Sequence, residues 1–312
     1  MKLNRFQYWE QGDAGEDWKI EGLVFDQFNL VVGRNATGKT RLLKAISRAA
    51  GEVSGDLRSS TVAARFELVL PDVRDLSDFP GAKNAQGAEL TRFRSEATAE
   101  WGRRAQYYPF AGRMTFKTPA SRGFTRWLLP DAYQHGVETI GRDFRARVLD
   151  WLEQAGYKMA DIKVEQAPAG GVELSVREAN RSAHLPLRRL SQGQQRTVTL
   201  LTYLALLVAR KKMVTVLIDD FAEGLDFEHA QLLARFLLKH CAQWPIQFII
   251  ATNDRYVMNT VPLEHWTILV EAGNTIRVFN YANSKKKFDD FKFTGLNNFD
   301  FFSMDFARDA AG

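Results

Sequence analysis

The sequence has little of what metal centres and redox sites are made of. It contains one cysteine, Cys241, and five histidines scattered along the chain. A single cysteine cannot close a disulfide within the chain, and these residues do not recur at the spacing of a metal-binding motif. We therefore exclude zinc-dependent and thiol redox chemistry as the basis of its function.

Long apolar runs and terminal sorting signals are also missing. No window approaches 18 consecutive apolar residues, and the start MKLNRFQYWEQGD lacks the apolar core and cleavage site of a signal peptide. There is no internal repeat, and no heptad pattern continues over several turns. We expect a cytoplasmic protein that has no membrane partner and no long coiled-coil arm.

The net charge of the 312 residues is only +5, and its distribution is more informative than its size. Between residues 89 and 126 there are eight basic residues and three acidic ones, which accounts for the whole excess. Aromatic residues are interspersed among them. Guanidinium groups neutralise phosphate and aromatic rings stack on bases, so the segment is compatible with DNA binding. It is equally compatible with a lobe whose aromatic residues form its own core.

The segment GRNATGKT, residues 33–40, lies between a strand-like stretch and a helix-like one, RLLKAISRAAG, for which Gly51 is the expected stop. Glycines let successive backbone N–H groups point at a phosphate chain, and the helix dipole adds attraction. We expect Lys39 to bridge the outer phosphates and the Thr40 hydroxyl to coordinate Mg²⁺. The candidate ATP-binding residues here are Gly33, Arg34, Asn35, Ala36, Thr37, Gly38, Lys39, Thr40 and Arg41.

The stretch TVLIDD is an apolar run that ends in two carboxylates, Asp219 and Asp220. Open α/β sheets bind ligands at the carboxyl ends of buried parallel strands, where such a pair is tolerated. We expect Asp219 to help Thr40 hold magnesium and Asp220 to orient or deprotonate an attacking water. The alternative is a solvated turn that carries acidic residues.

A second polar cluster precedes the apolar run of a helix expected over residues 192–210, which is apolar nearly all round and so predicts burial. Ser191 and Gln194 have the spacing of a capping box, and Gly193 allows close backbone approach. The candidate anion-binding residues are Ser191, Gln192, Gly193 and Gln194. One ATP needs a single phosphate loop from its own subunit, so we expect this site to meet the nucleotide of a second copy. A helix cap without a ligand is the alternative.

The order GRNATGKT, LSQGQQR, LIDDFAEGLD resembles that of ATP-binding-cassette (ABC) ATPases, specifically the RecF and SMC branch that acts on DNA. The resemblance implies that LSQGQQR is the signature motif, Asp219 the magnesium aspartate and Asp220 the catalytic carboxylate. It implies that Leu225 and Asp226 lie in a loop that crosses a dimer interface, and that Arg5 lies near the nucleotide base. The implied ligands are ATP and Mg²⁺, and the implied assembly is a homodimer with ATP between the subunits.

Two departures from the family pattern bear on catalysis. Most ABC ATPases have glutamate where this chain has Asp220, although RecF-like proteins tend to pair two aspartates there; Glu223 is a less suitable substitute. The family's switch histidine is replaced by Asn253, which can hydrogen-bond the γ-phosphate but cannot take a proton. We expect slow hydrolysis. The glutamine that usually contacts magnesium is not identifiable, and Gln106 is a weak candidate.

The motif order predicts an α/β P-loop NTPase of ABC type with a mixed central sheet and an inserted α+β lobe. We expect residues 1–51 and 188–281 to form the ATPase core, residues 52–187 the inserted lobe, which partly completes the core, and residues 282–312 a phenylalanine-rich tail. Within the lobe we expect a helix over residues 138–156 and a hairpin across PAGG.

Two functions remain open from the sequence. The first is an ATPase that dimerises around ATP and acts on DNA, or serves as a sensor in a genome-maintenance or anti-phage defence complex. The second is a nucleotide-switched scaffold that hydrolyses ATP weakly and regulates a partner effector such as a nuclease. The aromatic chain end is covered either by the chain's own core or by such a partner.

Overall fold

The structure, a computed structural model, describes residues 2–10, 18–53, 62–69, 105–108, 116–120, 123–127, 129–168, 170–211 and 214–304. The chain forms two compact units. Unit 1 comprises Met1–Tyr108, Met213–Asp220 and Gln247–Gly312, and unit 2 comprises Pro109–Lys212 and Phe221–Ile246. Residues 188–212 therefore group with the preceding lobe, whereas the motif order assigned them to one core with the phosphate loop.

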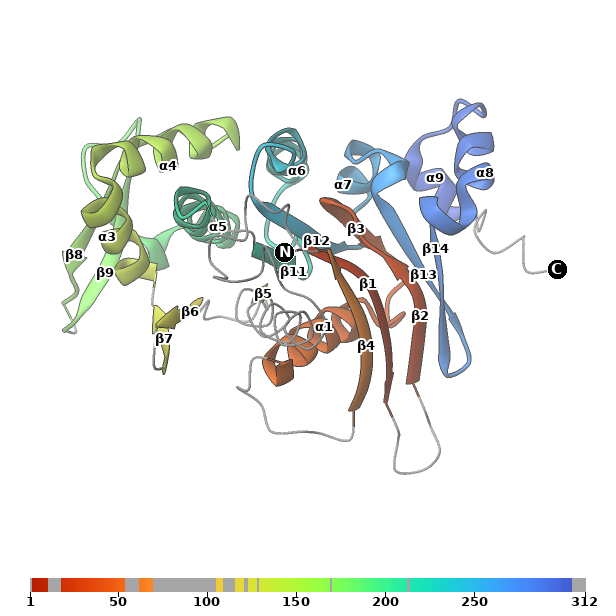
Figure 1. Ribbon diagram of the computed structural model, residues 1–312. Helices are drawn as coiled ribbons and strands as arrows, with labels where there is room; N and C mark the ends of the chain where they lie inside the picture. The colour runs from red at the N-terminus through yellow and green to blue at the C-terminus, as the bar shows by residue number, and fades with distance from the viewer. Residues whose placement is uncertain are drawn as a thin grey trace. The chain divides into compact units, whose positions relative to one another are not determined.

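Unit 1 is built on a nine-stranded mixed sheet with the strand order β4-β1-β2-β14-β13-β3-β12-β11-β5 (Figure 1). Its strands are β1 (Lys2–Glu10), β2 (Trp18–Val24), β3 (Phe28–Val32), β4 (Val62–Val69), β5 (Ala105–Tyr108), β11 (Val214–Ile218), β12 (Ile246–Thr252), β13 (Trp266–Ala272) and β14 (Thr275–Asn280). β1 pairs antiparallel with β2 and β4, whereas β3 pairs parallel with β12 and β13, and β11 with β5. The mixed sheet predicted from the motif order is confirmed.

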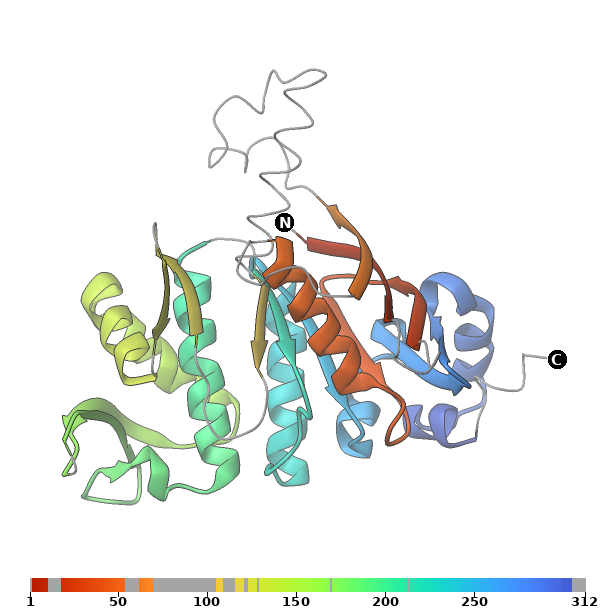
Figure 2. The same cartoon turned by 90° about the horizontal axis from the view of Figure 1, so that it is seen from below.

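The parallel part of the sheet carries the core of unit 1. Every residue of β3, β11 and β12 is buried, as expected for parallel strands that are covered on both faces. Helix α1 (Lys39–Val53) runs along one face of this sheet, as Figure 2 shows. Its Leu42, Leu43 and Ile46 share an apolar core with Leu217 of β11 and Ile249 of β12. This packing fixes the start of α1 beside the carboxyl ends of the buried strands.

Helix α1 is longer than expected, because it continues through Gly51 to Val53. A glycine inside a helix costs only about 1 kcal/mol relative to alanine, so it destabilises the helix without ending it. The predicted stop at Gly51 is wrong. The next strands along the chain are β4 and β5.

The chain end described by the structure packs on unit 1. It forms α7 (Arg255–Thr260), η4 (Leu263–His265), α8 (Tyr281–Lys292) and α9 (Asn298–Ser303). The Phe301 ring lies 4.8 Å from the ring of Phe288 and 4.8 Å from that of Phe291, and all three side chains are buried. Of the two alternatives for this aromatic segment, coverage by the chain's own core therefore holds for these residues. Phe293 is the contrast, at 90% exposure.

Unit 2 is organised around helix α5 (Gln192–Ala209), which is buried along most of its length and contacts α3 and α4. Its other elements are β6 (Phe116–Ala120), β7 (Gly123–Trp127), α3 (Leu129–Ile140), α4 (Arg142–Gln154), β8 (Met159–Gln166), β9 (Val172–Glu178), β10 (Leu185–Pro186), η3 (Leu187–Arg189) and α6 (Phe227–Cys241). The predicted hairpin across PAGG is confirmed, since β8 and β9 pair antiparallel. The predicted burial of the 192–210 helix is also confirmed.

The helix expected over residues 138–156 is confirmed in part as α4, but its predicted start is wrong because residues 138–140 belong to α3. Two helices, α3 and α4, meet there at Gly141, whose φ is 82°. A continuous right-handed helix cannot contain a residue in that left-handed conformation. The turn lets α3 and α4 contact each other and both contact α5.

Candidate functional site

The loop between β3 and α1 has the backbone curvature expected of a phosphate loop. Ala36 and Gly38 have φ values of 65° and 85°, and Gly38 lies against the Trp18 ring, 2.9 Å from where a Cβ would sit. A Cβ on Gly33 would collide with the Thr37 hydroxyl. Glycine is therefore required at both ends of the turn, by conformation at one and by space at the other.

The loop is held in this shape by its own hydrogen bonds. The Thr37 hydroxyl donates to the Arg34 carbonyl oxygen at 2.8 Å, and the Leu42 N–H donates to the Gly38 carbonyl oxygen at 2.8 Å, which starts the helix. The Lys39 ammonium folds back over the loop and donates to the carbonyl oxygens of Gly33 at 2.6 Å and Arg34 at 2.9 Å. Lys39 is thus directed into the concave side of the loop, where its charge is available to an anion.

The electrostatics of Lys39 are set by burial and by two carboxylates. Burial lowers the pKa of the Lys39 ammonium below its usual range, while Asp220 and Asp219 act in the opposite direction. Burial disfavours the charged form because the ammonium loses water, and the carboxylates partly offset that loss. An anion in the loop adds negative charge beside the ammonium.

A hydrogen bond connects the start of α1 to the end of β11. The Thr40 hydroxyl donates to Asp219 Oδ1 at 3.1 Å, and Asp219 is only 4% exposed. A hydroxyl oxygen and a carboxylate oxygen in contact are the ligand types that Mg²⁺ prefers. Thr40 and Asp219 therefore fit the magnesium role assigned to them, and a bound ion would supply positive charge to the outer phosphates.

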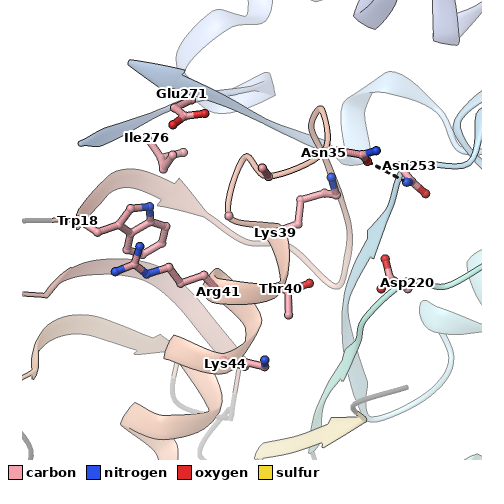
Figure 3. Close-up of a pocket in the computed structure, with 12 residues that line it drawn as sticks. Trp18, Asn35, Lys39, Thr40, Arg41, Lys44, Asp220, Asn253, Glu271 and Ile276 are labelled. Carbon is pink, nitrogen blue, oxygen red and sulfur yellow. Dashed lines mark hydrogen bonds between the residues drawn. The ribbon is translucent and has the colours of Figure 1, made fainter. Parts of the chain in front are cut away.

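Asp220 and Asn253 complete the polar side of the site. Asp220 follows Asp219 with a φ of 45°, a left-handed conformation that costs free energy for a residue with a side chain. Asn253 comes directly after β12, and its Nδ2 donates to Asn35 Oδ1 at 3.2 Å, which ties it to the loop (Figure 3). The carboxylate and the amide thus border one hollow.

That hollow is a cavity of about 630 Å³ within unit 1. It is lined by Trp18, Asn35, Ala36, Gly38, Lys39, Thr40, Arg41, Lys44, Asp220, Asn253, Glu271 and Ile276. Its volume is in the range of sites that bind small molecules. Most of the loop residues predicted to bind ATP therefore line the cavity, whereas Gly33, Arg34 and Thr37 shape the loop behind it.

Four lining residues were not predicted from the sequence. The Arg41 guanidinium stacks over the Trp18 ring, 4.5 Å from its centroid, which forms a flat wall beside the loop (Figure 3). Lys44, Glu271 and Ile276 lie around this wall. A signal for Lys44 existed, because it is one helical turn after Thr40; Trp18, Glu271 and Ile276 reach the site only through the sheet order.

Arg5, which the family resemblance places near a nucleotide base, does not line the cavity. It is an exposed residue of β1 and pairs in register with Val24 and Glu67. Trp18 of β2 lies at the cavity instead. Arg5 lies on β1, which is one strand further from β3 in the sheet than β2 is, and its proximity to a nucleotide base stays a prediction. Gln106 lies on β5, where only the backbone is described.

The signature-like residues lie in unit 2, and their predicted capping box is confirmed. The Gln194 N–H donates to Ser191 Oγ at 3.2 Å, and the Ser191 N–H donates to Gln194 Oε1 at 3.1 Å. Gln194 Nε2 also donates to Glu178 Oε1 at 2.9 Å, which orients the amide. Ser191 and Gln192 are exposed at the helix start. Free N–H groups and the helix dipole make this start suited to an anion.

Asp226, the other residue predicted in an interface loop, also lies in unit 2. It is the N-cap of α6 and accepts from the His229 N–H at 3.0 Å. That hydrogen bond, the largest contribution, holds the pKa of Asp226 below its usual range. The structure thus brings Lys39, Thr40, Asp219, Asp220 and Asn253 together in unit 1. The residues Ser191, Gln192, Gly193, Gln194 and Asp226 belong to unit 2.

The basic and aromatic segment at residues 89–126 lies largely outside the described residues. Only the backbones of β5, β6 and most of β7 are described within it. Its predicted contact with DNA is therefore not addressed by the structure. Among the described residues, no helix has both the length and the apolar character needed to cross a membrane.

Comparisons with known proteins agree on the fold. Residues 139–259, less than half of the chain, match the family model “AAA domain, putative AbiEii toxin, Type IV TA system”. This match includes the signature-like helix, both aspartates and β12. No curated protein matches the chain in sequence.

Two solved structures resemble the chain over nearly its whole length. An SMC head bound to the C-terminal winged-helix domain of ScpA aligns with a TM-score of 0.55 and 12% identity, covering 92% of this chain and 99% of that one. An SMC head domain with an extended coiled coil, bound to the C-terminal domain of ScpA derived from Pyrococcus furiosus, aligns with a TM-score of 0.55 and 10% identity, covering 93% and 99%. At such low identity the likeness establishes the fold alone.

Proposed function

This chain has the SMC-head fold of ABC-type P-loop ATPases, and from that premise we propose that it binds ATP with Mg²⁺, hydrolyses it, and pairs with a second copy around the nucleotide. One observation carries the proposal. Lys39, Thr40 and Asp220 line a single cavity at the carboxyl ends of the buried strands, and Asp219 lies behind Thr40 in hydrogen-bond contact with it. That arrangement matches the requirements of phosphoryl transfer, which are charge neutralisation and positioning.

The roles of the chain's own groups follow from their chemistry. The Lys39 ammonium exchanges its two carbonyl partners for oxygens of the β- and γ-phosphates. Asp220 accepts a proton from a water molecule, whose oxygen forms a bond to the γ-phosphorus while the bond to the bridging oxygen breaks and ADP leaves. Asn253 donates a hydrogen bond to the γ-phosphate but cannot carry the proton away, so we expect slow turnover. Magnesium, held by Thr40 and Asp219, supplies charge neutralisation when bound.

The test of this proposal is phosphate release from ATP. We expect the wild type to hydrolyse ATP slowly with magnesium, and Lys39→Ala and Asp220→Asn to lose turnover by at least about a hundredfold, the scale of a lost general base or charge clamp. Lys163→Ala is the matched control, because that lysine pairs with Glu165 on unit 2. If Lys39→Ala retains wild-type turnover, hydrolysis at this cavity is refuted.

We infer a second copy because the start of α5, which we propose as a further anion site, lies in a different unit from the phosphate loop. A site of this kind binds the γ-phosphate of a nucleotide held by another subunit. Ser191→Arg introduces a bulky cation at the exposed helix start. We expect this variant to bind ATP as a monomer and to lose both ATP-dependent dimerisation and turnover. Normal hydrolysis by Ser191→Arg would contradict the two-copy mechanism.

We further propose DNA as the target, which the excess of basic and aromatic residues between 89 and 126 supports. The expected result is phosphate release that DNA stimulates and that added salt suppresses. If DNA neither binds nor alters turnover at moderate salt, this part of the proposal fails. A role in genome maintenance or anti-phage defence belongs to the same proposal, and the match of residues 139–259 to a toxin-related AAA family supports the defence role.

A second candidate function is a nucleotide-switched scaffold that regulates an effector protein. Two observations favour it, namely Asn253 in place of a switch histidine and the 90% exposed Phe293. The variant Phe293→Ser is the test, since it removes an exposed apolar side chain without touching the cavity. Loss of a co-purifying subunit, with ATP hydrolysis retained, would favour the scaffold over the DNA-dependent ATPase.

A further inference from the structure

The loop at residues 221–226 meets the head of α5 backbone to backbone within unit 2. A Cβ on Gly193 would lie 2.5 Å from the Gly224 carbonyl oxygen and 3.0 Å from Leu225 Cδ2. Gly224 has a φ of 75°, and a Cβ there would lie 2.8 Å from Gln192 Cγ. Both glycines are needed for this approach, so neither segment can shift far without the other.

A first side-chain interaction, called here the first tie, connects α5 to the 221–226 loop. Arg196, 6% exposed, donates from its NH1 to the backbone carbonyl of Glu223, and the same nitrogen lies 3.3 Å from the Glu223 carboxylate. A buried guanidinium is stable only where it is paired and hydrogen-bonded. Because one acceptor is a backbone oxygen, Arg196 restrains the backbone of the loop as well as a neighbouring side chain.

A second tie runs from α5 through two rings to Asp226. The Thr197 hydroxyl donates to the Gly193 carbonyl oxygen at 2.9 Å. Burial raises the pKa of the Tyr157 phenol, and the nearby Thr197 side chain opposes that rise. The Tyr157 ring stacks on the His229 ring, with centroids 4.2 Å apart and planes 21° apart. His229 Nδ1 lies 2.7 Å from Asp226 Oδ2. These contacts connect the second turn of α5 to the end of the loop.

The ring of His229 has little freedom to leave this position. Tyr157 covers one part of it, and Gly156, with a φ of 93°, approaches so closely that a Cβ there would lie 2.9 Å from His229 Cδ2. The His229 N–H bonds the other Asp226 oxygen at 3.0 Å. Both carboxylate oxygens of Asp226 are therefore directed by one well-packed residue.

We infer that Arg196 and His229 are positioning residues that hold the 221–226 loop against the first two turns of α5. The loop and the helix start then move together when two copies dimerise around ATP. The inference rests on the proposed function, in which the head of α5 meets the partner's nucleotide. A shift of Ser191 toward a γ-phosphate then moves Asp226 with it. Neither Arg196 nor His229 lines the ATP cavity, so their role is exerted through the loop.

The variants are chosen to break each tie singly. His229→Phe keeps a ring for Tyr157 to stack on but lacks the nitrogen that faces Asp226. His229→Asn restores a nitrogen at the same number of bonds from Cα and loses the stack. Arg196→Met keeps an unbranched side chain without the donors. Tyr157→Phe removes only a hydroxyl, so it tests the second tie even if Arg196→Met does not fold.

Matched controls are available in the same unit. His184 also pairs with an aspartate, Asp161, at 3.0 Å, and Arg188 pairs with Glu173 at 3.1 Å. Neither takes part in the contact between α5 and the 221–226 loop. His184→Phe and Arg188→Met therefore reproduce the loss of a histidine–aspartate or arginine–glutamate pair without disturbing either tie.

The readouts are kcat for ATP hydrolysis, ATP affinity at protein concentrations below dimerisation, and the thermal unfolding midpoint. We expect His229→Phe and Arg196→Met to lower kcat by about tenfold or more, with ATP affinity unchanged within about twofold. Tyr157→Phe should lower kcat severalfold, and His229→Asn should recover part of the loss seen in His229→Phe. The two control variants should hydrolyse ATP at the wild-type rate.

Failure of this inference is distinguishable from failure of the proposed function. If folded His229→Phe and Tyr157→Phe match the wild-type kcat while Ser191→Arg is inactive, the two-copy mechanism stands and the coupling is refuted. A kcat for His229→Asn no higher than that of His229→Phe would also overturn the role of the Asp226 contact. Normal hydrolysis by Ser191→Arg would instead refute the proposed function.

Discussion

At the scale of single residues, the hydrogen bonds and burial of Lys39 make the loop suited to bind an anion. Its ammonium donates to two backbone carbonyl oxygens, so two of its three N–H groups are hydrogen-bonded although the residue is buried. Binding exchanges neutral acceptors for charged phosphate oxygens, which form stronger hydrogen bonds. The same burial makes the charge of Lys39 sensitive to pH.

The lowered pKa of Lys39 predicts a loss of ATP affinity at alkaline pH. Desolvation favours the neutral amine, so as pH rises the charge is lost earlier than for an ordinary lysine. ATP affinity should therefore fall as the pH rises through the lowered pKa of Lys39. Equilibrium binding across this range measures the effect. Lys39→Arg, which keeps its charge, is the control, and an identical alkaline fall in that variant would contradict the assignment to Lys39.

Gly38 gives a second prediction at this scale. Gly38→Ala should abolish ATP binding, because the new Cβ would lie 2.9 Å from the Trp18 ring at a φ of 85°. Gly170→Ala is the matched control, since its φ of 88° is similar and no heavy atom lies within 4 Å of a Cβ there. The control carries the backbone strain without the collision. ATP binding by titration should be lost only in Gly38→Ala; retained affinity would mean that Trp18 moves aside.

At the scale of elements, the head of α5 has both a structural and a functional role. Its capping box satisfies two N–H groups that have no partner within the helix, and Glu178 fixes the amide of Gln194. The exposed position of Ser191 leaves its hydroxyl accessible beside the remaining N–H groups. Stability and ligand binding can therefore be separated experimentally.

Ser191→Ala should lower the free energy of unfolding by about 1 kcal/mol, the usual contribution of an N-cap. It should also weaken ATP-dependent dimerisation, because the hydroxyl is lost from the proposed anion site. Asn297→Ala removes the equivalent cap of the α9 capping box and is the control for stability alone. Chemical denaturation and sedimentation with ATP measure the two effects. Equal dimerisation by both variants would assign Ser191 a capping role only.

At the scale of the whole molecule, the aromatic chain end divides into a buried part and an exposed part. Phe301 packs between Phe288 and Phe291 on unit 1, whereas Phe293 is exposed in the turn after α8. Truncation of this segment would remove core residues as well as a surface. A partner role for the chain end is therefore tested by point substitution.

Phe301→Ala should lower the free energy of unfolding by about 3–5 kcal/mol, since it leaves a cavity in the core. Phe293→Ala should change it by less than about 0.5 kcal/mol, as is usual for an exposed position. Both values come from denaturant unfolding followed by circular dichroism. A large loss of stability in Phe293→Ala would show that this side chain is covered in solution.

The assembly itself is tested by mass. Asp220→Asn should bind ATP, fail to hydrolyse it and accumulate as a dimer, because the nucleotide that joins two copies is not consumed. Light scattering should show a monomer without nucleotide and a dimer with ATP and magnesium. The double variant with Ser191→Arg should remain monomeric. A monomer in Asp220→Asn with saturating ATP would refute the proposed pairing.

The sequence by itself determined the features that depend on neighbours along the chain. The phosphate loop, the Ser191–Gln194 capping box and the hairpin of β8 and β9 were predictable because a turn or a helix start is specified by a few consecutive residues. The α/β class followed from the order of the motifs and the family that this order resembles. The separation of α3 from α4 at Gly141 was missed because an amphipathic pattern does not reveal which glycine adopts a positive φ.

Only the tertiary structure decided which distant residues meet. Trp18 reaches the ATP cavity, and Arg5 does not, because of the order in which the strands pair. The contacts of Arg196 with Glu223 and of Tyr157 with His229 likewise join segments that no periodicity relates. Such contacts depend on the register and packing of whole elements, which many residues set together, and so a local pattern cannot specify them.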